Sequence, residues 1–93
     1  MTASSTWQVY LLRCNDNSLY AGITTDIQRR LLQHNNSKLG AKYTRARRPV
    51  FLVYLEDCND RSNASKREYK LRKLTKLKKE KLVKEYLTSD RSA

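Results

Sequence analysis

Tyr10 and Tyr20 stand in two short apolar segments, separated by the polar residues 15–18. A tyrosine hydroxyl loses its proton more easily beside positive charge, because the charge stabilises the phenolate, and it can then take a proton from water. Arg30 and His34 follow at a spacing suited to one shared site and could supply that charge. Tyrosine is also a common strand residue, so half-buried packing is the alternative interpretation.

Arg30 and His34 lie four positions apart, so on a helix they share one face. A helical wheel places them at the border of an apolar stripe that contains Ile27 and Leu31. Burying two basic groups beside apolar residues is costly without an anion to receive them, so we expect both to point at one phosphate. The alternative for His34 is a packed or capping position at the helix edge.

Glu68 is the acidic residue of most interest. On a helical wheel it lies near Ala64 and Leu71, on the inward edge of a segment otherwise rich in Lys and Arg. A carboxylate in that position can hold a hard divalent cation against phosphate oxygens. The alternative is an ion pair with Arg72, four residues later. Because no two carboxylates have the spacing of a two-metal site, we expect one ion.

The composition points to a polyanionic partner. The 93 residues include 20 Lys and Arg against 9 Asp and Glu, which gives a formal charge of +11 and makes nucleic acid the leading partner class. A chain of this length has a thin core, so a deep pocket is not expected. It has no apolar stretch of membrane-spanning length, and residues 1–6 are too short and polar for a secretion signal, so we expect a cytoplasmic protein.

The two cysteines do not indicate a metal site. Cys14 and Cys58 are far apart in the sequence, and one histidine cannot complete a zinc site with them at the usual spacings. We interpret both as small apolar residues near strand ends in a reducing compartment.

Three strands are expected, at 7–14, 19–23 and 50–55. Residues that tolerate tight turns join the first two into a hairpin. The third is a continuous apolar run, typical of a strand buried on both faces, and we expect it at the centre of the sheet.

The register of the hairpin decides where the tyrosines point. If the loop has an odd number of residues, Tyr10 opposes Gly22 and Tyr20 opposes Leu12, so both tyrosines share one face. We prefer this register because it gathers five apolar side chains on the other face. These are Val9, Leu11, Leu19, Ala21 and Ile23.

A helix is expected from about Asp26 to Asn36, with Thr25 as its N-cap, because Gln28 completes the capping-box pattern three residues later. Two more helices are expected, from about 62 to 74 and after Thr75, followed by a frayed tail at 88–93. We expect a single domain over residues 1–93, with its core at 7–87.

A basic segment lies between the first helix and the third strand. It is usual for such a segment to be a solvated loop, but Lys, Arg and Tyr together also suit contact with a phosphate backbone, and the net charge favours that function. The expected contact residues are Lys42, Tyr43, Arg45, Arg47 and Arg48.

These residues, in this order, resemble the GIY-YIG nuclease domain, and the resemblance runs from about residue 7 to residue 87. Tyr10 takes the place of the first tyrosine of that name, and Tyr20-Ala21-Gly22 matches its second half. Three further residues fall where the family carries its Arg, its His or equivalent, and its metal-binding Glu: Arg30, His34 and Glu68. More closely, the chain looks like the small stand-alone bacterial members, whose segment after the first helix is similar to residues 40–49.

The resemblance implies an α+β fold in which helices flank a three-stranded antiparallel sheet, the same layout that the strand and helix patterns give. It also implies hydrolysis of a DNA phosphodiester by in-line water attack with one divalent ion, Mg²⁺ or Mn²⁺. By position, Tyr10 is then the general base, and Tyr20 hydrogen-bonds water or phosphate. Arg30 stabilises charge on the phosphate, His34 assists as a proton or phosphate ligand, and Glu68 binds the metal.

We expect the activity to be a structure-selective endonuclease in DNA repair or recombination. We expect a shallow site and no attached targeting domain, so DNA shape or a separate targeting protein would direct it. RNA is an alternative substrate, and no membrane partner is expected, since the Lys-rich last helix lacks the Trp or Phe that enters lipid.

The chain departs from the family pattern at four places. Gln8 and Val9 replace the first Gly and Ile, and Ala21 replaces the second Ile. Many members also have an Asn one helix after the Glu, and no residue after Asn63 fills that role. A non-catalytic nucleic-acid-binding module with the nuclease fold is therefore the alternative function.

Overall fold

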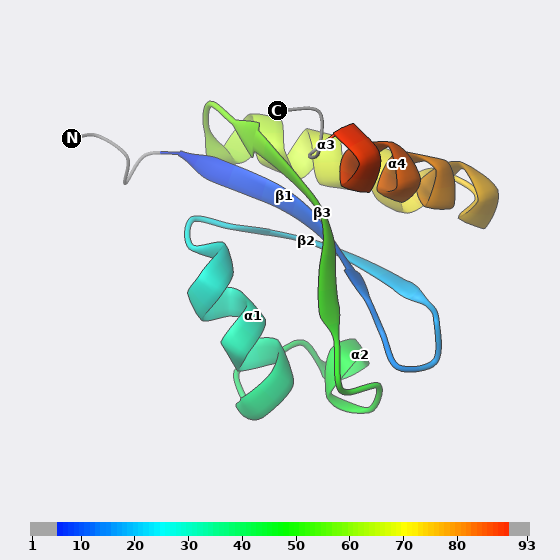
Figure 1. Ribbon diagram of the computed structural model, residues 1–93. Coiled ribbons are helices and arrows are strands. Elements are labelled where there is room, and N and C mark those ends of the chain that lie inside the picture. The colour runs from blue at the N-terminus through cyan, green and yellow to red at the C-terminus, as the bar shows by residue number, and fades with distance from the viewer. Residues whose placement is uncertain (1–5, 90–93) are drawn as a thin grey trace.

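The computed structural model describes residues 6–89 (Figure 1). Its strands are β1 (Trp7–Arg13), β2 (Leu19–Thr24) and β3 (Phe51–Cys58). Its helices are α1 (Ile27–Asn36), the short α2 (Lys42–Arg45), α3 (Arg61–Lys73) and α4 (Lys76–Ser89). The strands form an antiparallel sheet in the order β2-β1-β3, so the expected α+β fold is confirmed.

The hairpin has the register that places both tyrosines on one face. Tyr10 pairs with Gly22 and Leu12 with Tyr20, as expected for an odd loop. Asn17 adopts the left-handed conformation at φ 71°, which Asn tolerates better than most residues, and the Cys14 amide bonds the Ser18 carbonyl at 2.8 Å to close the turn.

The central strand is β1, so the expectation that the third strand lies in the middle of the sheet is wrong. Every side chain from Val9 to Leu12 is buried, because β1 is paired along both edges and covered on both faces. β3 is an edge strand, and its first residue, Phe51, is 58% exposed. An apolar run alone does not distinguish a central strand from an edge strand that is covered by helices.

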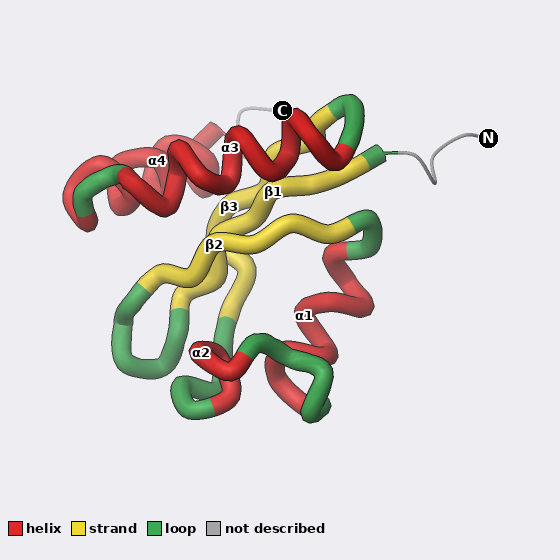
Figure 2. The backbone as a smooth tube through the Cα atoms, turned by 180° about the vertical axis from the view of Figure 1, so that it is seen from behind, coloured by secondary structure: helices red, strands yellow, loops and turns green. Residues whose placement is uncertain are grey.

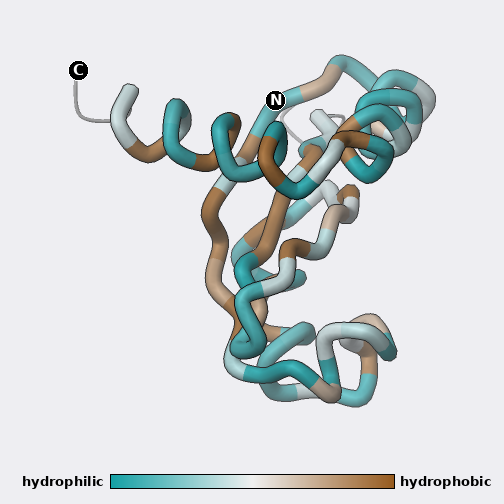
Figure 3. Tube along the Cα trace, turned by 90° about the vertical axis from the view of Figure 1, so that its right-hand side faces the viewer, coloured by the Kyte–Doolittle hydropathy of each residue, from teal (hydrophilic) through white to brown (hydrophobic). Residues whose placement is uncertain are grey.

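Helices cover both faces of the sheet. One apolar cluster joins Tyr10, Leu12 and Val50 to Ile27 and Leu31 of α1. The other cluster lies behind the sheet, where α3 and α4 pack. Figures 1 and 2 show these two groups from opposite sides, with α1 and α2 at one end and α3 and α4 together at the other. In Figure 3 the hydrophobic colour is concentrated on the strands between them.

The N-cap of α1 is Asp26, not Thr25. The Asp26 carboxylate accepts from the Arg29 amide at 3.1 Å, and the Thr24 hydroxyl accepts from the Asp26 amide at 3.1 Å. A threonine buried at the end of β2 thus supports the cap, which shifts the start of the helix by one residue. Asp60 caps α3 in the same way, through the Asn63 amide.

The last helix runs further than the sequence indicates. Thr88 and Ser89 belong to α4, although we expect them in a frayed tail; residues 90–93 of that tail lie outside the described part. Over residues 6–89, no helix is both long enough and apolar enough to cross a lipid bilayer.

Candidate active site

The ring of Tyr10 lies directly over Gly22 on the neighbouring strand. A β-carbon at position 22 would stand 2.4 Å from the Tyr10 hydroxyl oxygen and 2.5 Å from Cζ, far inside contact distance. The glycine of the Tyr20-Ala21-Gly22 segment is therefore needed for close approach by an aromatic ring. The ring itself is almost fully buried.

His34 joins the two tyrosines. Its Nε2 atom lies 2.8 Å from the Tyr10 hydroxyl, and its ring packs edge-on against Tyr10 and Tyr20, at centroid distances of 5.8 and 5.5 Å. His34 is completely buried, which combines the packed position that we gave as the alternative with a direct contact to Tyr10. The face of α1 that carries it is the face that the helical wheel predicts.

The segment after α1 closes the other side of the imidazole. The Ala41 amide donates to Nδ1 at 3.3 Å, and the buried Thr44 hydroxyl lies 2.9 Å from the same atom. Gly40 allows this approach, because a β-carbon there would lie 2.6 Å from the Gln33 carbonyl oxygen. A backbone amide is a permanent donor, whereas a hydroxyl can rotate, so we assign the proton of neutral His34 to Nε2, which then donates to Tyr10.

Arg30 adds positive charge at the exposed side of this group. Its guanidinium bonds the Gln33 side chain and the Leu39 carbonyl oxygen, both at 2.9 Å, which holds it beside α1. Its hydrogen bond and charge act to lower the pKa of Tyr10, and its charge does the same at Tyr20.

Burial nevertheless outweighs the cations. It raises the pKa of Tyr10 to about 12, and it raises the pKa of Tyr20 as well. Burial, helped by the positive charges of Arg30 and Arg48, lowers the pKa of His34 to about 4, so His34 is neutral at pH 7. The expectation that neighbouring charge makes the phenolate easy to form is thus wrong for the protein alone, because desolvation disfavours the charged phenolate more strongly.

Glu68 approaches the tyrosines from α3. Its carboxylate accepts from Arg72 Nε at 2.9 Å, which is the pair that we gave as the alternative, and its side chain is only 19% exposed. Its negative charge also contributes to the raised pKa of both Tyr10 and Tyr20, so it lies within electrostatic reach of the two rings. The structure thus brings all five expected residues into one region.

The basic segment divides into two groups. Arg48 donates to backbone carbonyls at the end of α1, including that of His34 at 2.6 Å. Arg47 donates to the Asp16 carboxylate at 2.9 Å, and its guanidinium lies 3.8 Å from the centroid of the Tyr43 ring. These two arginines have structural partners. Lys42 and Arg45 are exposed, and the Arg45 guanidinium lies 3.4 Å from the Lys38 carbonyl oxygen.

Sequence patterns do not directly indicate the two groups that contact His34 Nδ1, which are the Thr44 hydroxyl and the Ala41 amide. Thr44 belongs to the basic segment and is an ordinary polar residue there, yet it is completely buried. The contribution of Ala41 is a backbone amide, which side-chain patterns do not report. Gly40, one of only two glycines in the chain, is the signal that could have located this contact.

Comparison with known proteins identifies the family of this chain. The family described as the GIY-YIG catalytic domain matches residues 6–81. The chain belongs to the GIY-YIG family. It is 58% identical over 78 residues to a UPF0213 protein of Desulfotalea psychrophila, covering 84% of this chain and 71% of that protein. A UPF0213 protein of Bacillus velezensis is 54% identical over 76 residues, covering 82% and 76%.

Two solution NMR structures are similar to this chain in fold. A protein of E. faecalis superposes with a TM-score of 0.57 at 45% identity, covering 88% of each chain. The UPF0213 protein of Bacillus halodurans gives a TM-score of 0.54 at 43% identity, covering 85% of this chain and 83% of that one. The expected family and the expected kind of relative, small single-domain bacterial proteins, are therefore confirmed.

GIY-YIG nucleases generally depend on a divalent metal, and the chemistry of Glu68 fits such an ion. Mg²⁺ is usually held by one or two carboxylates together with water and substrate phosphates, and Glu68 supplies one carboxylate near the tyrosines. Within residues 6–89, no three His, Cys, Asp or Glu side chains form a metal-binding cluster. Glu68 is therefore the residue of this site that could hold a divalent ion, with water and substrate phosphate as its other ligands.

Proposed function

We propose that this GIY-YIG protein is a metal-dependent endonuclease that hydrolyses DNA phosphodiester bonds. We further propose that it selects distorted or branched DNA and acts in repair or recombination. The observation that carries the proposal is the convergence of five residues beside the edge strand β2: Tyr10, Tyr20, Arg30, His34 and Glu68.

In this mechanism Tyr10 is the proton acceptor. Tyr10 first releases its proton to solvent. Because the His34 N–H donates to its oxygen and Arg30 lies beside it, the resulting phenolate has two donors in place. The water oxygen attacks phosphorus as its proton passes to the phenolate, and the bond from phosphorus to the leaving oxygen breaks. The leaving oxygen then takes a proton from solvent.

The other residues act on the phosphate. Arg30 stabilises the charge that develops on the phosphate oxygens, and Tyr20, which is only partly buried, hydrogen-bonds the water or the phosphate. Glu68 would hold one ion, Mg²⁺ or Mn²⁺, which supplies positive charge for the transition state when it is bound. We propose that DNA shape contributes more to selection than base contacts do.

A nicking assay tests this function. Supercoiled, branched and single-stranded DNA are incubated with Mg²⁺ or Mn²⁺, using the natural protein, Tyr10→Phe and Glu68→Gln. Matched controls are Tyr69→Phe and Glu85→Gln, since both residues are exposed on the helices. We expect metal-dependent cleavage that falls by two or more orders of magnitude in the first pair only. Equal activity in all five proteins would reject the assignment.

A non-catalytic nucleic-acid-binding module is the second candidate. The pKa of Tyr10 near 12 favours it, because a protonated phenol is a poor base at neutral pH, and so does the absence of the late Asn. DNA binding by the natural protein, without cleavage at any metal concentration or at pH 9, would establish this second function.

A further inference from the structure

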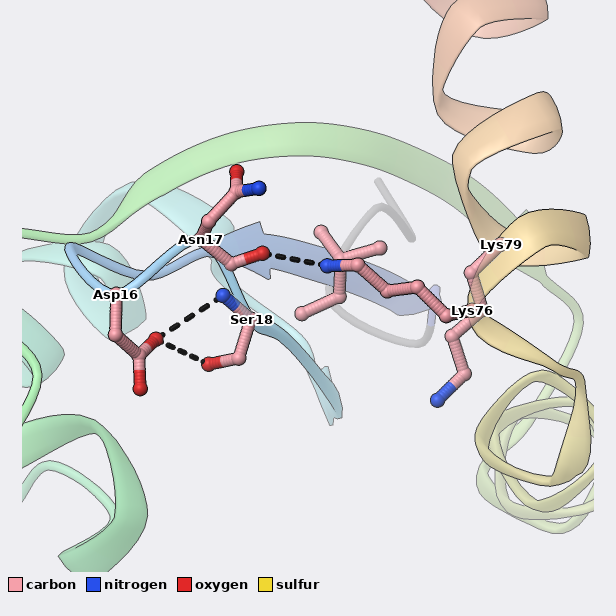
Figure 4. A pocket seen from close by; sticks show the side chains of 6 residues that line it. Asp16, Asn17, Ser18, Lys76 and Lys79 are labelled. Atoms are coloured by element: carbon pink, nitrogen blue, oxygen red, sulfur yellow. Dashed lines mark hydrogen bonds between the residues drawn. The ribbon is translucent and has the colours of Figure 1, made fainter.

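Two hollows extend from the tyrosine site along the edge strand β2. The first, of about 280 Å³, is lined by residues 19–21 of β2, by Tyr43, by Arg72 of α3 and by Lys79 of α4. The second, of about 440 Å³, lies between the β1–β2 turn and the start of α4 (Figure 4). They share Leu19 and Lys79, so they adjoin, and we call the two hollows together the trough.

Most charges along the trough are already paired. Arg72 bonds Glu68, Asp16 bonds Arg47, and Lys76 bonds both Glu80 and the Asn17 carbonyl oxygen. Figure 4 shows the Lys76 amine at that carbonyl, while Lys79 has no hydrogen bond to the residues drawn.

Lys79 lies at the junction of the two hollows and is partly buried. Among residues 6–89, no group forms a hydrogen bond or an ion pair with the side-chain amine of Lys79. A lysine that is held against a surface, with no carboxylate to neutralise it, is suited to receive an anion.

The opposite wall is aromatic. Tyr43 stacks on Tyr20 at a centroid distance of 5.8 Å and an interplanar angle of 21°. A groove with cations on one side and tyrosines on the other suits a nucleic acid strand, whose phosphates meet the cations while its sugars and bases contact the rings. The smaller hollow is about the size of one nucleotide rather than of a duplex, since drug-sized ligands occupy roughly 300 Å³ or more.

We propose that this trough binds the sugar–phosphate backbone of a single strand next to the cleaved bond, with Lys79 as its phosphate anchor. The proposal rests on the proposed nucleic-acid substrate and adds the path that one strand takes, from Tyr20 past Lys79 to the hairpin turn. The strand enters unpaired, so junctions, flaps and other DNA with a free strand bind better than continuous duplex.

Binding is measured with a labelled single-stranded oligonucleotide in EDTA, so that cleavage plays no part. Lys79→Gln is compared with Lys84→Gln, which removes the same charge from an exposed position of the same helix. We expect Lys79→Gln to weaken binding by roughly 3- to 10-fold and to make the log–log salt slope shallower by about 0.7, the value for one phosphate on a single strand. Lys84→Gln should have a smaller effect on both the binding affinity and the salt slope.

NMR titration of the labelled protein gives an independent readout. The amides of residues 18–21 should shift when the oligonucleotide is added, and the shifts should be smaller in Lys79→Gln. Equal loss of affinity in the two lysine variants, or chemical-shift changes centred on other residues, would reject strand binding in the trough even if the protein cleaves DNA. If the protein does not cleave DNA but Lys79→Gln weakens binding as expected, the trough stands as a binding site and the nuclease function is rejected.

Discussion

Replacing Gly22 by alanine tests whether close approach of Tyr10 organises the site. The new methyl carbon would lie 2.4 Å from the Tyr10 hydroxyl oxygen, whereas ordinary contact begins near 3.4 Å, so the oxygen must move by about 1 Å. The ring cannot move freely, because it is buried and bonded to His34 at 2.8 Å. The expected result is a folded protein with a displaced hydroxyl.

Two magnitudes follow from this displacement. Forcing a methyl group into packed surroundings costs about 1–3 kcal/mol of stability. Misplacing a reacting group by about 1 Å lowers the rate by a factor on the order of 100. Gly22→Ala should therefore lose most of its activity while it remains folded at room temperature.

The assay is a double-mutant cycle. Urea unfolding is measured for the natural protein, Gly22→Ala, Tyr10→Ala and the double variant. Without the ring the extra methyl group has space, so Gly22→Ala should cost little in the Tyr10→Ala background, with a coupling of about 1 kcal/mol or more. Additive costs would refute the reasoning, as would a Gly22→Ala protein that cleaves DNA at the natural rate.

Three further results are expected. The folded state keeps His34 neutral with a pKa near 4, against 6.5 for an unperturbed histidine. The free energy of unfolding should therefore be unaffected by His34 above pH 6.5 and should fall by on the order of 3 kcal/mol as the pH drops to 4, because the unfolded chain protonates first. Urea unfolding across that range should show a much weaker dependence in His34→Gln. Arg48→Met should lose about 1–2 kcal/mol of stability, because it removes hydrogen bonds to the end of α1, and it should leave the salt slope of duplex binding unchanged. Arg45→Met should preserve stability and should reduce that salt slope by about 0.9, as measured by fluorescence titration. Thr44→Val should shift the nitrogen NMR signals of His34 and slow cleavage, and Thr44→Ser should restore both; unchanged signals in Thr44→Val would show that the hydroxyl does not hold the imidazole.

Several features of the site could be predicted from neighbouring residues alone. The hairpin register follows from alternation and loop length, and it correctly pairs Tyr10 with Gly22. The spacing of Arg30 and His34 predicts their common helical face. The Asp60 cap and the start of α3 are equally local, because they depend on side chains that reach only the next turn.

Other features depend on segments that are distant in the sequence. An apolar run reports burial but not which strand occupies the centre, so the position of β3 required the packed sheet. A basic residue looks the same whether it meets phosphate or a helix end, so the role of Arg48 required the fold.

The difference between what the sequence determines and what the fold decides is clearest for the titratable groups of the site. The sequence by itself determined that a phenol, an imidazole and a guanidinium would meet, because strand and helix periodicity fix the faces on which they lie. Only the tertiary structure decided the direction of the pKa shifts. Desolvation depends on the whole shell of atoms around Tyr10 and His34, and that shell comes from α1, β2 and the 40–44 segment together.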